Sequence, residues 1–64
     1  MAKLCQFQRS ESGNHETVWI NPMNVSELSA GKDGSVVITF AGKHTATVVG
    51  ELNGVAAKIE QALY

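Results

Sequence analysis

The stretch "SAGKDGSVVITFAGKHTATVV", residues 29–49, decides the fold. It contains the tripeptide Ala-Gly-Lys at residues 30–32 and again at 41–43, on either side of the apolar run 35–40. Gly followed by Lys also occurs in phosphate-binding loops, but those loops continue with Ser or Thr and then a helix. Here His44 follows the second Gly-Lys pair, and another β-branched run comes next. The stretch therefore predicts two tight turns around one strand, with a returning strand over 43–49.

Two glycines mark these turns. Asp33-Gly34 is a frequent hairpin dipeptide, and Ala41-Gly42 is short enough for a tight connection. Glycine reaches a positive φ without a Cβ clash, so the glycines of both Ala-Gly-Lys copies, Gly31 and Gly42, are predicted to take that conformation, while Gly34 is predicted to mark the first turn. The first turn connects back to a weaker strand predicted within residues 24–30.

Two further strands are predicted before this stretch. Residues 4–8, "LCQFQ", alternate between apolar and polar side chains, and residues 17–21, "TVWIN", are rich in β-branched and aromatic residues. Pro22 has no N–H for a strand ladder and restricts the residue before it, so the second strand should end there. The polar segment 10–16, "SESGNHE", is predicted to be a loop.

The C-terminal segment has a helical pattern. Apolar residues recur at helical spacing, and Asn53 is a good N-cap, so a helix is predicted over about 54–63. Connections between the predicted strands are too short for parallel pairing. Residues 1–64 are therefore predicted to form one mainly β (α+β) domain: a small antiparallel sheet or partly closed barrel of four to five strands, followed by one C-terminal helix. The apolar helical positions are Leu52, Val55, Ile59 and Leu63.

Apolar side chains fall on both faces of the predicted strands. Val37 alternates against Val36 and Ile38, and Trp19 and Val49 are similarly out of phase with their neighbours. A sheet with one solvated face should alternate more cleanly, and one helix cannot cover both faces. Either the sheet curls into a barrel or sandwich, or a second copy covers it, although single exposed valines are also ordinary in strands. We expect Trp19 to be buried, and self-association, as a dimer or higher oligomer, to involve Trp19, Val37 and Val49.

The sequence lacks patterns typical of catalytic or metal sites. Cys5, His15 and His44 lie in three separate segments, without the local spacing of a zinc site. Cys5 has no evident basic neighbour and is predicted to be a core residue. No nucleophile elbow occurs, and a chain of 64 residues has little room for a catalytic pocket. The sequence therefore predicts a protein that is not an enzyme, with no catalytic residues, metal or cofactor.

Composition limits the partners and the compartment. Five basic residues against six acidic ones give a net charge of −1, and the basic residues are scattered rather than gathered in a stripe. A single cysteine fits a reducing compartment, and no apolar run is long enough for a signal peptide or a membrane span. We therefore expect a cytoplasmic protein that does not bind membranes.

At "VWINPMNV", residues 18–25, the sequence resembles the FlbD-like small flagellar proteins of bacteria. The similarity runs from about residue 17 to 63, with a strand that ends in Asn21-Pro22, a hairpin with Gly42 at its turn, and a short terminal helix. The polar loop at 10–16 and Gly54 early in the helix depart from that family's pattern. The resemblance implies a small cytoplasmic accessory or regulatory protein without catalysis.

Two classes of function remain open. The first is a non-catalytic protein-interaction module, acting as a homo-oligomer and binding an unknown protein partner through an edge strand or the Trp19 face. The second, less favoured, is a small nucleic-acid-binding regulator that stacks bases on Phe7, Trp19 or His44 and contacts phosphates with the scattered lysines. Binding to oligonucleotides that weakens steeply with salt would distinguish the second.

Overall fold

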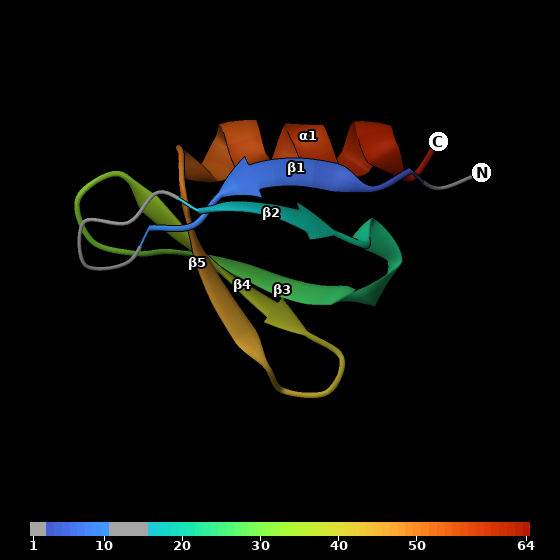
Figure 1. Cartoon of the computed structure of the whole chain (residues 1–64), viewed down its shortest axis with the longest axis horizontal. Helices are drawn as coiled ribbons and strands as arrows, with labels where there is room; N and C mark the ends of the chain where they lie inside the picture. The colour runs from blue at the N-terminus through green and yellow to red at the C-terminus, as the bar shows by residue number, and fades with distance from the viewer. Residues whose placement is uncertain (1–2, 11–15) are drawn as a thin grey trace.

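The computed structural model describes residues 3–10 and 16–64. In these ranges five strands precede one helix, which confirms a mainly β, α+β fold (Figure 1). The predicted loop at residues 10–16 lies almost entirely outside the described residues. The elements are β1 (Cys5–Gln8), β2 (Thr17–Ile20), β3 (Val25–Ala30), β4 (Ser35–Phe40), β5 (Thr45–Val49) and α1 (Leu52–Ala62), with a short 3-10 helix, η1 (Pro22–Asn24), after β2.

The strands form two antiparallel sheets rather than one. β1 pairs with β2 in a hairpin, and the other sheet has the order β3-β4-β5. One corner joins the two sheets, because Arg9 bridges to Val48 and the Ser10 N–H donates to the Thr47 carbonyl at 2.8 Å. Within the described ranges the outer edges of β2 and β3 have no strand partner, so these strands do not close a barrel.

The core lies between the hairpin, the three-stranded sheet and α1, which runs along the hairpin (Figure 1). Val36, Ile38 and Val48 are completely buried on the inner face of the three-stranded sheet. Burying a side chain of this size contributes about 1.5–3 kcal/mol relative to leaving it exposed. The hairpin and the helix together cover this inner face. A single subunit therefore provides the covering layer that one helix alone would be too small to form. The remaining core residues are Cys5, Phe7, Ile20, Val55 and Ile59.

The outer face of the three-stranded sheet carries mainly Ser and Thr side chains. Val37 stands between Ser29 of β3 and Thr47 of β5, and Val49 pairs with Ser35. The prediction that the strands are apolar on both faces therefore does not hold for this sheet. Val37 lies between Ser and Thr side chains, so the centre of this face is not a continuous apolar surface.

The two Ala-Gly-Lys segments do form the turns that flank β4, but neither Gly31 nor Gly42 takes the predicted positive φ. Positive φ values occur at Gly34 (φ 74) and Asp33 (φ 52) in the first turn, and at Lys43 (φ 67) in the second. A Cβ added at Gly42 would lie 3.2 Å from Cδ2 of His44. Gly42 is therefore favoured by the close approach of the His44 ring, while Lys43 takes the left-handed conformation.

Helix α1 begins at Leu52, two residues before the predicted start, and ends at Ala62. Glu51, not Asn53, occupies the N-cap, and its side chain makes no capping hydrogen bond. The backbone supplies the start instead, because Gly50 turns the chain out of β5 at a φ of 149° and the Val55 N–H donates to the Glu51 carbonyl at 2.9 Å. The prediction from the N-cap preference of Asn53 was wrong because the preceding turn, and not a side-chain cap, determines where the helix begins.

Pro22 does end β2 as predicted. It is buried at the first position of η1, where its missing N–H costs nothing, and the Asn21 side chain accepts a hydrogen bond from the Met23 N–H at 3.0 Å.

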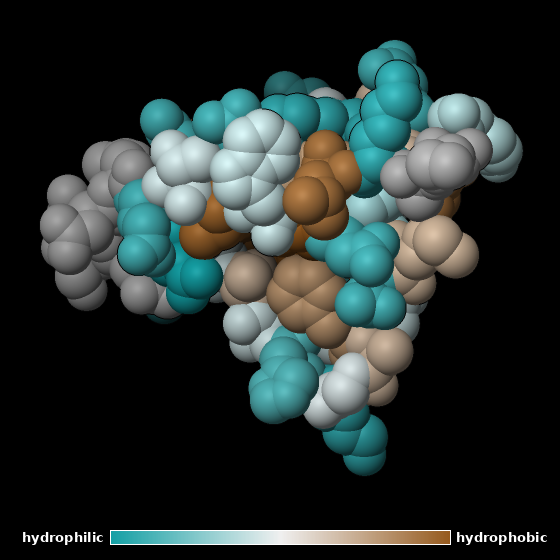
Figure 2. Space-filling model, turned by 45° about the vertical axis from the view of Figure 1, so that its right-hand side comes forward, coloured by the Kyte–Doolittle hydropathy of each residue, from teal (hydrophilic) through white to brown (hydrophobic). Residues whose placement is uncertain are grey.

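Figure 2 shows hydrophobic atoms gathered in the middle of one face, with hydrophilic side chains around them. In the described part of the chain, no helix has the length and apolar character needed to cross a membrane.

Candidate protein-interaction surface

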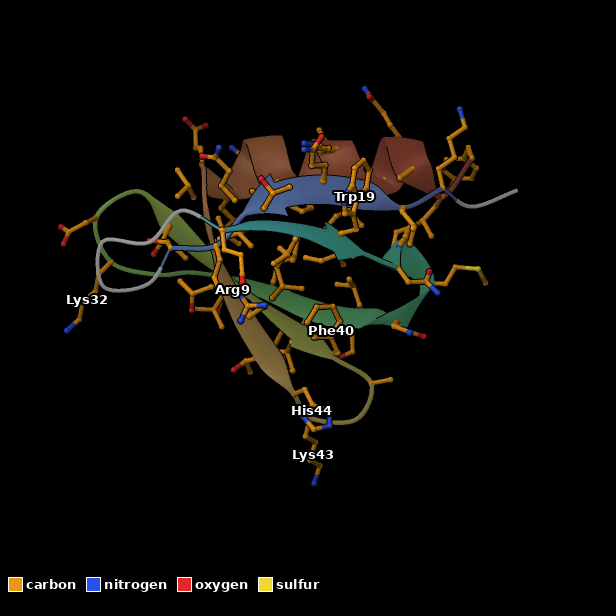
Figure 3. All side chains as sticks on the ribbon, in the orientation of Figure 1. Arg9, Trp19, Lys32, Phe40, Lys43 and His44 are labelled. Carbon is orange, nitrogen blue, oxygen red and sulfur yellow. The ribbon has the colours of Figure 1, made fainter. Side chains whose placement is uncertain are left out.

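Trp19 lies on the outer face of the β1–β2 hairpin, away from the core (Figure 3). It stands opposite Gln6, and 61% of its surface is exposed. Leu4, which immediately precedes β1, is 59% exposed. Alternation along the hairpin explains this placement, because Ile20 and Val18 face inward and leave Trp19 facing outward. The expected burial of Trp19 is therefore not found within a single subunit.

Two neighbouring hollows follow β1, and we call them together the β1 groove. The first, next to Trp19, has a volume of about 450 Å³, and the second, toward the end of β5, about 300 Å³. Gln6 and Lys58 line both hollows, so the two adjoin at these residues. The first is lined by Lys3, Leu4, Cys5, Gln6, Trp19, Lys58, Gln61 and Ala62, and the second by Gln6, Phe7, Gln8, Val49 and Lys58.

Lys58 crosses from α1 to β1 at the middle of the groove. Its ammonium donates a hydrogen bond to the Gln6 carbonyl and lies 4.7 Å from the centroid of the Phe7 ring. An ammonium has three donors and is attracted to the face of an aromatic ring, so these two contacts hold the charge in place and leave donors available. Sequence reasoning missed Lys58, because nothing local indicates a contact across 52 residues.

Cys5 lies at the floor of the first hollow. It is 3% exposed, and its thiol is 3.8 Å from the carbonyl oxygen of Lys58. Burial raises the pKa of the Cys5 thiol above its ordinary value of 9.0, although the nearby Lys58 charge acts in the opposite direction. The thiol is therefore neutral near neutral pH, and a neutral thiol is a poor nucleophile. This agrees with the predicted core role of Cys5.

The three predicted interaction residues do not form one surface. Val49 is 41% exposed and lines the second hollow of the β1 groove, so the structure brings it to the same groove as Trp19. Val37 is half-buried and lines a different hollow, of about 440 Å³, with Lys32 and Thr47. The structure adds Leu4, Lys3, Lys58 and Gln61 to the candidate surface.

The residues proposed for base stacking are also separated. Phe7 is 6% exposed in the core, so it is not available to stack on a base. His44 and Lys43 lie at the tip of the β4–β5 turn, and Lys32 lies on the β3–β4 turn, so both turns are well separated from Trp19 (Figure 3). In residues 3–10 and 16–64 no three His, Cys, Asp or Glu side chains are grouped to hold a metal ion. His15 lies outside these ranges.

Comparison with protein-family models, with curated proteins and with solved structures finds no match to this chain.

Proposed function

We propose that the chain is a non-catalytic protein-interaction module, with an accessory or regulatory role, that binds a partner protein in the β1 groove. The observation that carries the proposal is a tryptophan 61% exposed beside a concave surface of about 450 Å³. Tryptophan is enriched at the centres of protein interfaces, where its large ring gives much contact area at little entropic cost. The exposed Leu4 extends this apolar contact.

The chemistry of the groove supports binding rather than catalysis. Its polar groups are the ammonium groups of Lys3 and Lys58 and three glutamine amides, and its one thiol is buried. In the described part of the chain no carboxylate or imidazole lines either hollow. Without such a group the groove has no evident general base at neutral pH. The glutamines are Gln6, Gln8 and Gln61.

A second copy of the chain is the alternative occupant of the same groove. Homo-oligomer formation would bury Trp19 and Leu4 without any other partner. Sedimentation over a wide range of concentrations distinguishes the two cases, because only self-association depends on the concentration of the chain alone.

The proposal places the protein in the cytoplasm, where a free buried thiol such as Cys5 stays reduced. The resemblance to the FlbD-like proteins favours an accessory role there.

The nucleic-acid alternative has less support from the positions of the side chains. It retains Trp19 for stacking, but the exposed cations at Lys32 and Lys43 lie on separate turns rather than along one path (Figure 3). Retention on immobilised oligonucleotides at low salt, lost as salt is raised, would favour this alternative over a protein partner.

Replacing Trp19 with Ala tests the proposed function. A tagged wild-type chain should capture a specific protein from its native cell, and Trp19→Ala should lose that protein, because an interface tryptophan typically contributes about 2–4 kcal/mol to binding. Trp19 is outside the core, so circular dichroism should show an intact fold. Met23→Ala is the matched control, since Met23 is 71% exposed on η1 and lies outside the groove. Equal losses with the two variants, or no loss with Trp19→Ala, would refute the proposal.

A further inference from the structure

The β1 groove carries a local positive charge in a chain that is close to neutral. The chain has a net charge of −1, yet Lys3 and Lys58 both line the first hollow and no acidic side chain of the described residues does. Within the described residues neither lysine is paired with a carboxylate, and the ion pair between Arg9 and Glu16, at 3.5 Å, lies at the base of the hairpin. The groove therefore presents two ammonium groups that a carboxylate of a partner can reach.

The apolar part of the groove lies directly beside these charges. Trp19, Leu4 and Ala62 line the same hollow as the two lysines. The first hollow, of about 450 Å³, is open to solvent, so an apolar side chain of a partner can approach the Trp19 ring there. The groove combines an anchor position with flanking positive charge.

The groove also fits an extended chain. Between them, the two hollows are lined by all four residues of β1, and the second also reaches Val49. Four residues of strand span about 13 Å at a rise of about 3.3 Å per residue. The glutamine side chains along this path are neutral donors and acceptors, suited to the backbone of a peptide.

Charge distinguishes between the two occupants. A second copy bound face to face on this groove would bring its own Lys3 and Lys58 into an interface that already holds the same pair. Like charges placed together in an interface oppose binding, whereas opposite charges favour it and speed association. We propose, on the basis of the proposed function above, that the β1 groove binds an extended acidic segment of a partner protein, with one bulky apolar side chain beside Trp19 and carboxylates on Lys3 and Lys58.

Three synthetic hexapeptides, blocked at both ends, test this inference against the ¹⁵N-labelled full chain. The acidic peptide is Asp-Glu-Leu-Phe-Glu-Asp, the neutral one Ser-Gln-Leu-Phe-Gln-Ser, and the basic one Lys-Lys-Leu-Phe-Lys-Lys. The acidic peptide should bind about tenfold more tightly than the neutral one at low salt, and the basic peptide should bind least. The difference should shrink between about 0.05 M and 0.5 M salt as the charges are screened. NMR shifts should concentrate on the Trp19 indole and on residues 4–8 and 58–62.

Charge variants locate the effect. Lys3→Gln and Lys58→Gln should each weaken binding of the acidic peptide about two- to fivefold and leave the neutral peptide unchanged. Lys32→Gln is the matched control, with the same change of charge on an exposed turn outside the groove. Lys58 also packs on Phe7, so Lys3→Gln keeps the test informative should Lys58→Gln unfold the chain.

Several outcomes would overturn the inference. These are equal binding of the acidic and neutral peptides, equal weakening by Lys3→Gln and Lys32→Gln, NMR shifts outside the groove, and a free protein whose groove is already occupied by a second copy. If the acidic peptide fails while Trp19→Ala still abolishes capture of the native partner, the proposed function stands and the inference about partner chemistry falls.

Discussion

Ile38→Ala is expected to unfold most of the protein at room temperature. Ile38 is fully buried at the centre of β4, between Leu28 of β3 and Ala46 of β5. Truncating a buried isoleucine to alanine removes about 2–5 kcal/mol of stability, because it loses both the transfer energy and the packing around the cavity. A core in a domain of this size rarely supplies more than about 3–5 kcal/mol, so the loss is comparable with the whole stability. Urea unfolding followed by far-UV circular dichroism measures the change.

Val37→Ala is the control, since it makes a similar truncation on the same strand. Val37 is half-buried on the outer face, among Ser and Thr side chains, so the loss should be no more than about 1 kcal/mol. If Val37→Ala costs as much as Ile38→Ala, the outer face of the sheet is buried in solution, and the assignment of inner and outer faces is wrong.

Two glycine-to-alanine changes at the start of α1 should have opposite signs. Gly50 has a φ of 149°, and a Cβ added there would lie 3.0 Å from the Val55 Cγ2, so Gly50→Ala should cost about 1–3 kcal/mol. Gly54 lies inside α1, and an added Cβ meets nothing within 4 Å. Gly54→Ala should therefore stabilise the protein by about 1 kcal/mol, because alanine loses less backbone entropy in a helix.

Thermal and urea unfolding of both variants measure this difference directly. The pair provides its own control, since each variant adds the same methyl group within one turn of the helix start. Destabilisation by Gly54→Ala, or an unchanged stability with Gly50→Ala, would contradict the observed start of α1 at Leu52. A helix that began near Gly54, as the sequence alone suggests, would not give opposite signs.

Short-range sequence patterns predicted much of the fold. The alternation at residues 35–40 matches β4 at both ends, and Asn21-Pro22 ends β2 as expected. The Asp33-Gly34 pair lies in the turn between β3 and β4, as its hairpin dipeptide predicts. These features depend on side-chain periodicity, on the fixed φ of proline and on the missing Cβ of glycine, all of which act within a few residues.

The candidate surface could be predicted only in part, because it depends on contacts between distant segments. The corner that joins the two sheets depends on the Arg9–Val48 bridge, and the positive centre of the groove follows from Lys58 reaching Gln6. Neither contact has a local signature. The sequence did point to Trp19 and Val49, but residue preference suggested burial, whereas the strand phase turns Trp19 outward. Val37 is likewise an apolar residue at an outward-facing strand position, but β4 places it at another surface hollow.

Trp19 fluorescence is the most direct test of the central claim, which is that the subunit folds alone and leaves the β1 groove open for a partner. Trp19 is the single tryptophan of the chain, so its emission reports on this position without interference. In the free, dilute protein the emission should lie close to that of tryptophan in water and be readily quenched by acrylamide. It should shift to shorter wavelength and become protected when the captured partner is added. A blue-shifted, protected Trp19 in the free protein at every concentration would contradict the account.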